Sequence, residues 1–219
     1  MIVTAHQPNF LPGVSVISKI LDSDAVIWAD EVAYSHYSYT ARNRMPDGST
    51  VSAGLRAVSR HGPINRVELD PNSGWRAKLA RTLLYHYGEA GEPYATEVLR
   101  PYGLLVGLNA ALLHRLLGDL DSRAVWHWQS QLLGGRPLES IMDDRATSGL
   151  RRQISHQLAA MVAEVGGDVY LSGPSGRRYL DEAFFVEREI EVRYWEHVGP
   201  NPCALALVVA RRDELAWAA

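Results

Sequence analysis

A stiff polar loop near the N-terminus constrains the fold more than any other stretch of the chain. The apolar run at residues 2–5 predicts a buried first strand, and the segment 6–13 follows it directly. Pro8 and Pro12 end that strand and delay a helix, because proline lacks a backbone N–H and restricts the residue before it. A rigid loop must therefore leave the end of the first strand.

A helix and a second strand follow this loop. Apolar residues recur with helical spacing over 14–21, and residues 25–28 form a second apolar run that ends before an acid pair. This order predicts one βαβ unit, and ligands bind at the carboxyl ends of the strands in open parallel sheets. The polar residues that leave the two strands at that edge are His6, Gln7, Asn9, Asp30 and Glu31. In the alternative, His6 and Gln7 only hydrogen-bond the turn.

The C-terminal part predicts a second unit of the same kind. After a helix over 147–165, residues 168–172 predict a strand, 173–176 a tight loop, 178–189 a helix and 190–195 another strand. Crossovers between parallel strands are right-handed, so both units should place their strand ends at one edge. The residues expected to converge there are His6, Asp30, Ser172, Ser175 and His197.

The region between the two units predicts a different architecture. Residues 42–44 and 50–53, joined by a turn at 46–49, predict a β-hairpin, and 63–69 alternate like a half-buried strand. Helices are expected from residue 75, after a possible cap at Ser73, to a break at 88–93, and over 94–118 with a break at 101–103. Residues 120–143 favour neither strand nor helix. The prediction is a single three-layer α/β domain over 1–219, with a mainly parallel sheet of βαβ units and an inserted helical region near 75–145.

Composition narrows the class of protein. The formal net charge of −3 argues against strong general affinity for nucleic acid, which needs a positive surface. No apolar stretch approaches the roughly 20 residues of a membrane span, and the N-terminus does not resemble a signal peptide. The single cysteine, Cys203, fits a reducing compartment and predicts a packed thiol rather than a nucleophile. We therefore expect a cytoplasmic protein.

Two histidines are candidates for acid–base chemistry. His6 or His197 could act as general base or acid, because imidazole titrates nearest pH 7, and Asp30 or Glu31 could orient one of them. None of the usual His or Cys metal spacings occurs, so neither a metal nor another cofactor is expected. The 172–177 loop lacks the spacing of a P-loop or a nucleophile elbow. It could cradle a carboxylate or phosphate, or it could be a structural turn.

Several clusters together resemble one known family. They are His6-Gln7-Pro8-Asn9-Phe10-Leu11-Pro12, Asp30-Glu31 with Tyr34, Arg42-Asn43-Arg44, Trp75 with Lys78, Tyr170-Leu171-Ser172-Gly173 with Gly176, Tyr179 and Asp181, and His197. In these residues the chain resembles the WbqC-like family. It departs from the family pattern after Pro12 and after His197, where a divergent tail occupies 198–219.

The resemblance implies a role in bacterial polysaccharide or natural-product biosynthesis. The implied reaction transfers an aminoacyl group from an activated donor to a small amine or amino sugar. The donor could be an aminoacyl-tRNA, a carrier-protein thioester or an adenylate. The predicted catalytic residues are His6, Asp30 and His197, and the predicted substrate-binding residues are Gln7, Asn9, Glu31, Tyr34, Asn43, Arg44, Ser172, Ser175 and Tyr179. The alternative is a non-catalytic accessory subunit of a biosynthetic complex. The sequence leaves the oligomeric state open.

Overall fold

The computed structural model describes residues 1–71, 74–132 and 148–218, and the chain forms two compact units. The first unit comprises Met1–Gln7, Ser18–Ala33 and Arg123–Gly199. The second comprises Pro8–Ile17, Tyr34–Ser122 and Pro200–Ala219. The chain passes between the units several times, and the single-domain organisation expected for 1–219 stays a prediction.

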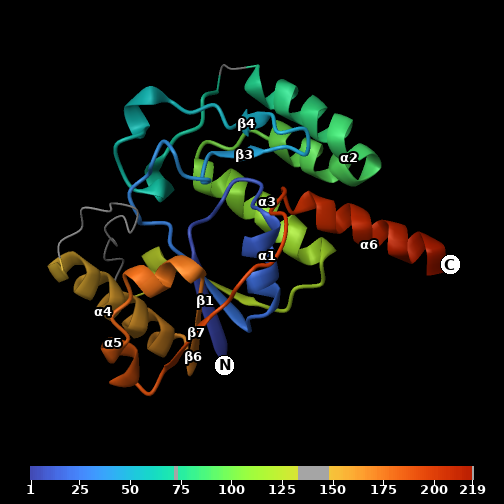
Figure 1. Ribbon diagram of the computed structural model, residues 1–219. Helices are drawn as coiled ribbons and strands as arrows, with labels where there is room; N and C mark the ends of the chain where they lie inside the picture. The colour runs from blue at the N-terminus through green and yellow to red at the C-terminus, as the bar shows by residue number, and fades with distance from the viewer. Residues whose placement is uncertain (72–73, 133–147, 219) are drawn as a thin grey trace. The chain divides into compact units, whose positions relative to one another are not determined.

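The first unit contains a five-stranded sheet in the order β5-β2-β1-β6-β7 (Figure 1). Its strands are β1 (Ile2–His6), β2 (Ala25–Trp28), β5 (Val125–Trp128), β6 (Val169–Ser172) and β7 (Glu191–Tyr194). All four neighbouring pairs are parallel, so every strand ends at the same edge. The predicted parallel sheet, with both βαβ units, is confirmed.

Helices flank this sheet on both faces. Helix α1 (Val14–Leu21) follows β1 and leads to β2, whereas α5 (Ala183–Val186) leads from β6 to β7 in the opposite direction along the sheet. Right-handed crossovers that run in opposite directions lie on opposite faces. Helix α4 (Ser148–Glu164) packs with α5, and Figure 1 shows the two helices on the same side of the sheet. The three-layer α/β fold is therefore confirmed.

The central strands are apolar because both faces of the sheet are covered. All four residues of β2 are buried, and Ile17 and Ile20 of α1 are also buried. Tyr170 of β6 stacks on Phe185 of α5, with the ring centroids 5.1 Å apart. The continuous apolar run at 25–28 thus reflects burial from two sides, in contrast to the alternation of a half-exposed strand.

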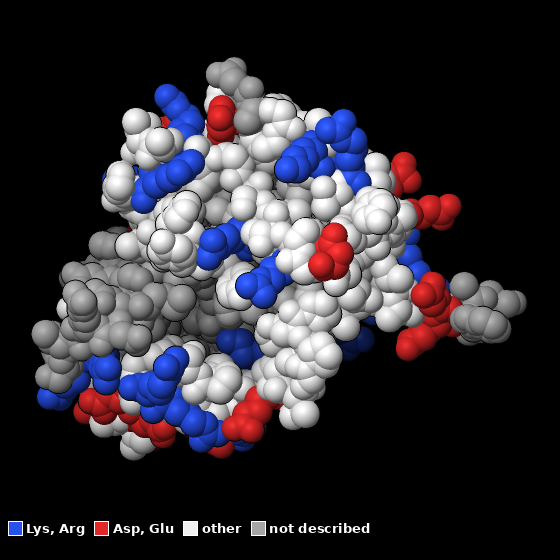
Figure 2. All heavy atoms as spheres, turned by 45° about the horizontal axis from the view of Figure 1, so that its top comes forward, with Lys and Arg blue, Asp and Glu red and all other residues white. Residues whose placement is uncertain are grey.

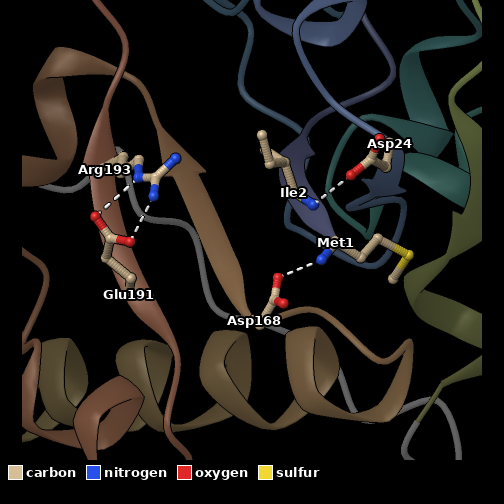
Figure 3. A network of polar contacts seen from close by, with 6 residues as sticks. All are labelled: Met1, Ile2, Asp24, Asp168, Glu191 and Arg193. Atoms are coloured by element: carbon tan, nitrogen blue, oxygen red, sulfur yellow. Dashed lines mark hydrogen bonds and ion pairs between the residues drawn. The ribbon is translucent and has the colours of Figure 1, made fainter.

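At the amino edge of the sheet, charged groups pair with one another (Figure 3). The α-amino group of Met1 donates to Asp168, and the Ile2 N–H donates to Asp24 Oδ2 at 2.7 Å. Arg193 donates twice to the Glu191 carboxylate, at 2.8 and 2.7 Å. The first two contacts tie the start of β1 to the residues before β6 and β2, whereas the Arg193–Glu191 pair lies within β7.

The second unit contains the predicted hairpin and several helices. Strands β3 (Arg42–Arg44) and β4 (Thr50–Ser52) pair antiparallel, as the turn chemistry at 46–49 predicts. The helices are α2 (Trp75–Leu99), α3 (Leu105–Asp119) and α6 (Leu205–Ala218). Helix α6 packs against α2 and α3, so the divergent tail forms part of the core of this unit.

Two sequence-based assignments are wrong. Residues 63–69 contain a 3-10 helix (Ile64–Arg66) and isolated bridges instead of a strand, because the alternating apolar residues pack without a continuous partner strand. The helix expected over 178–189 is reduced to α5. A 3-10 helix (Pro174–Arg178) precedes it, and Asp181 accepts a hydrogen bond from the Ala183 N–H, which starts α5 anew.

Other boundaries are refined. The break expected at 88–93 is a kink within α2, where Gly88 adopts φ 52° and ψ −134°, a conformation that suits glycine. In the undecided stretch after residue 120, β5 is followed by a 3-10 helix (Gln129–Gln131). A further 3-10 helix spans Ala57–Ser59. The proposed cap Ser73 lies outside the described residues, as does the segment 133–147.

One arginine closes the C-terminal end of α2. The last carbonyl groups of a helix have no partner within the helix. The Arg76 guanidinium donates to the carbonyl oxygens of Val98, Arg100 and Tyr102, each at 2.8 Å. This side chain therefore links the start of α2 to its end and to the break that precedes α3.

We expect Arg76→Met to lower the free energy of unfolding by about 2 kcal/mol, because carbonyls that accept charge-assisted hydrogen bonds lose their donors. Arg81→Met is the matched control, since Arg81 is an exposed arginine of the same helix and its loss should change stability by less than about 0.5 kcal/mol. Urea unfolding of both variants measures the difference. Equal stability of the two variants would contradict this role of Arg76.

Candidate functional site

The carboxyl edge of the sheet contains a candidate ligand site between the neighbouring strands β1 and β6. Strands β1 and β6 are neighbours, yet the chain leaves β1 toward β2 and leaves β6 toward β7. Loops that depart in opposite directions leave a crevice at such a switch point, and open α/β sheets bind ligands there. His6 ends β1 and Gln7 follows it, while Ser172 ends β6 and Gly173 follows it.

The His6 ring is held in one tautomer. Its Nδ1 lies 3.1 Å from the carbonyl oxygen of Gln7. Because a carbonyl can only accept, Nδ1 carries the proton and donates, and Nε2 keeps its lone pair. The half-buried imidazole is thus oriented as a proton acceptor at the end of β1.

His6 is neutral over the physiological range. Burial, together with the nearby charge of Lys19, lowers the pKa of His6 to about 3, against a small opposing effect of the Gln7 carbonyl. Burial also lowers the pKa of Lys19, to about 8. The end of β1 therefore combines a neutral imidazole with an ammonium group in poorly hydrated surroundings. Sequence reasoning missed Lys19, although its place between the apolar residues Ile17 and Ile20 of a core helix was a signal.

The loop after β6 packs tightly on Ser172. Ser172 is buried and its hydroxyl donates to the Gly173 carbonyl at 3.2 Å, whereas Ser175 is exposed on the 3-10 helix. A Cβ placed on Gly176 would lie 2.1 Å from the Ser172 hydroxyl and 3.0 Å from Leu180 Cδ1. Gly176 is thus explained by close packing, which favours the structural-turn interpretation of this loop.

The predicted residues near β7 lie beside aromatic rings. His197 follows β7 and stacks on Trp195, with centroids 5.9 Å apart. The Trp195 indole N–H donates to Asp22 at 2.7 Å, which anchors the stack. Tyr179 is half-buried, and burial raises its pKa to about 12, so its hydroxyl stays protonated.

Asp30 has an evident structural role. Its buried carboxylate accepts the Ser130 N–H at 3.0 Å and the Ser130 hydroxyl at 2.7 Å. These bonds tie the residues after β2 to the 3-10 helix after β5. Asp30 therefore braces the carboxyl edge, while the neighbouring Glu31 is half-buried. Ser130 is a second residue that the sequence did not single out.

Four predicted substrate-binding residues belong to the second unit: Asn9, Tyr34, Asn43 and Arg44. Asn43 and Arg44 line a small pocket of about 140 Å³ with Tyr37, Tyr39, Arg42 and Thr50. The Asn43 amide donates to the Leu11 carbonyl, and its oxygen accepts the Arg44 N–H at 2.7 Å. Asn9 is buried, and burial raises the pKa of Tyr34. The expected single pocket that joins these residues to His6 stays a prediction.

The described residues offer neither a metal site nor a membrane-spanning helix. Among the described residues, no group of three or more His, Cys, Asp or Glu side chains is arranged to hold a metal ion. None of the helices in the same part of the chain is both long enough and apolar enough to cross a membrane. Burial also raises the pKa of the Cys203 thiol, as expected for a packed rather than a nucleophilic cysteine.

We expect Gly176→Ala to lower the free energy of unfolding by about 1–3 kcal/mol, because the new methyl group must displace the Ser172 hydroxyl and Leu180. Gly173→Ala is the control in the same loop, since a Cβ there meets nothing within 4 Å. Thermal unfolding of both variants is the measurement. Similar losses of stability in the two variants would show that packing on Ser172 is not the reason for a glycine at position 176.

Comparisons with known proteins identify the family of the chain. The model of the WbqC-like protein family matches residues 7–201. An uncharacterised protein of Mycobacterium tuberculosis (strain ATCC 25618 / H37Rv), Rv1507c, is 23% identical over 209 residues, which cover 90% of this chain and 83% of that protein. No solved structure matches the chain. Because the family model spans nearly the whole chain, the protein belongs to the WbqC-like family.

Proposed function

We propose that this protein catalyses amide formation by acyl transfer, moving an aminoacyl group from an activated donor to an amine acceptor in a biosynthetic pathway. The observation that carries the proposal is a proton-accepting imidazole, His6, at the switch point of a parallel sheet. Membership of the WbqC-like family supports a biosynthetic role.

The proposed step requires little beyond a base and an oxyanion site. The amine nitrogen of the acceptor attacks the acyl carbon of the donor, and the imidazole takes one proton from the amine as the C–N bond forms. The tetrahedral intermediate then collapses, the bond to the leaving oxygen or sulfur breaks, and the leaving group receives that proton. Donors such as the Gln7 side-chain amide and loop N–H groups would stabilise the oxyanion.

His6 meets part of what a general base needs. Its tautomer is fixed and Nε2 is unprotonated at neutral pH, so it can accept a proton without first losing one. Its pKa of about 3 is well below the value near 7 at which a base is most effective. A bound substrate that raises this pKa would strengthen the proposed role. His197 is the other candidate base, as the second histidine that leaves a strand at this edge.

The surface helps to rank the possible donors. Figure 2 shows Lys and Arg side chains in several separate groups, with Asp and Glu between them, on the face that it presents. That pattern, with a net charge of −3, favours a carrier-protein thioester or an adenylate over an aminoacyl-tRNA, which would need an extended basic surface. The proposal includes a cytoplasmic location, in line with the single cysteine.

The competing proposal is a non-catalytic accessory subunit. Such a protein could bind one small molecule at the same edge, whereas a transferase must bring a donor and an acceptor together. An accessory subunit would form no amide product from any donor and acceptor pair.

We expect His6→Ala to reduce turnover about 100-fold or more, the usual contribution of a general base. The free energy of unfolding should change by less than about 1 kcal/mol, because a half-buried loop-facing imidazole contributes little packing. The assay supplies glycyl-N-acetylcysteamine thioester with a panel of amino sugars and other amines, and mass spectrometry detects the amide product.

His61→Ala is the matched control, since His61 is exposed in the second unit and should keep full activity. Full activity of a stably folded His6→Ala variant would remove His6 from the mechanism.

A further inference from the structure

Lys19 is an unusual side chain for the core of this protein. It lies in the second turn of α1 and is only 5% exposed. Lysine is almost never fully buried unless its charge is paired. It is also one of only two lysines in the chain, with Lys78, against 20 arginines. A buried lysine in such a chain calls for a physical reason.

The position of Lys19 directs its ammonium group toward the end of β1. Helix α1 begins just after the loop that leaves β1, so its N-terminal end lies toward the carboxyl edge of the sheet. Long side chains in helices extend toward the helix N-terminus. The Lys19 ammonium accordingly lies close enough to His6 for its charge to lower the pKa of that imidazole.

The described part of the chain supplies no counter-charge for this ammonium. Across residues 1–71, 74–132 and 148–218, no carboxylate forms an ion pair with Lys19, and no oxygen accepts a hydrogen bond from its side chain. Burial alone accounts for its lowered pKa, with no group there that raises it. Lys19 nevertheless keeps a little accessible surface, since the residue is 5% exposed.

An unpaired, poorly hydrated ammonium destabilises a fold, and a bound anion would relieve that penalty. The neighbouring imidazole is neutral, so the pair carries one positive charge in total. A singly charged oxyanion would neutralise it. Carboxylates and phosphodiesters both have this charge and both present oxygens that an ammonium can bind.

We infer that Lys19 and His6 form a binding site for a singly charged oxyanion, a carboxylate or a phosphodiester, carried by a substrate at the carboxyl edge of the first unit. The site deepens the proposed function, because it identifies an anionic group on the donor or the acceptor. In this arrangement the three N–H groups of Lys19 bind the anion and fix the position of the reacting group beside Nε2 of His6.

The site would also couple binding to the chemistry. The charge of Lys19 lowers the pKa of His6, so an anion that neutralises Lys19 should raise it. His6 would then become a stronger base when the correct substrate is present. Without the anion, the imidazole stays a weak base, which would protect the activated donor from water.

The test exploits the two lysines of the chain. Protein labelled with ¹³C at lysine Cε should give one NMR signal for Lys19 and one for Lys78, assigned with Lys19→Arg and Lys78→Arg variants. Sodium acetate and sodium dimethyl phosphate are titrated separately, against sodium chloride at equal ionic strength. We expect one of the two anions to shift the Lys19 signal saturably and to raise its titration midpoint above about 8.

The controls separate this site from general salt effects. The exposed Lys78 should show only the small, unsaturable change that chloride also produces. Saturation with acetate alone identifies a carboxylate, and saturation with dimethyl phosphate alone identifies a phosphodiester. A Lys19 signal that responds to neither anion, or that merely follows Lys78, would overturn the proposal.

A stability measurement provides an independent check. Lys19→Met removes the buried charge, so it should raise the melting temperature at pH 7, and this gain should shrink as pH rises from about 8 toward 10.5, where lysine is neutral in the unfolded chain too. Saturable anion binding without acyl transfer would leave the site standing and reject the proposed function. Transfer activity that Lys19→Met leaves unchanged would reject the anion site and keep the proposed function.

Discussion

The parallel pairing of β1 with both β2 and β6 is the constraint on which the first unit depends. In register, Val3 lies opposite Ala25 on one side and Tyr170 on the other. Parallel strands run in the same direction, so this pairing places the residues after β1, β2 and β6 at one edge of the sheet. The chain leaves β1 and β6 in opposite directions, which opens the edge beside His6 and Ser172.

The two edges of the sheet differ in their electrostatics. At the amino edge, each charge that Figure 3 draws has a partner, as in Glu191 with Arg193. These groups are largely exposed, and such pairs contribute little to stability. At the carboxyl edge, the charge of Lys19 is buried and the imidazole of His6 is kept neutral. Perturbed groups of this kind concentrate at functional sites, whereas paired surface charges do not.

Local sequence patterns predicted much of this fold. The run 25–28 gave a strand with the bounds of β2, and the Pro46–Ser49 turn gave the hairpin, because both signals act within a few residues. The failures involve packing at long range. Residues 63–69 alternate as a strand does, but no neighbouring strand is available to pair along their length. Lys19 was overlooked although Ile17 and Ile20 lie beside it in the sequence, because the extent of its burial depends on how α1 packs.

The candidate site shows the same division. His6 could be predicted because the prolines after it force a loop at a strand end, whereas its tautomer and neutral state depend on Gln7 and Lys19. Asp30 was expected at the right edge, but its bonds to Ser130 required the position of β5, which the sequence left undecided. The strand order could therefore be predicted from the sequence, whereas the contacts of each side chain required the structure.

The candidate site depends on a neutral imidazole of fixed tautomer, His6, beside the buried ammonium of Lys19. ¹⁵N NMR of the eight histidines, with His6 assigned by its absence in the His6→Ala variant, tests this most directly. We expect a proton on Nδ1, an unprotonated Nε2, and no protonation of the His6 ring until the pH falls toward about 3. A His6 ring that titrates near 6.5, or that carries its proton on Nε2, would show that the imidazole is not the buried, oriented proton acceptor described above.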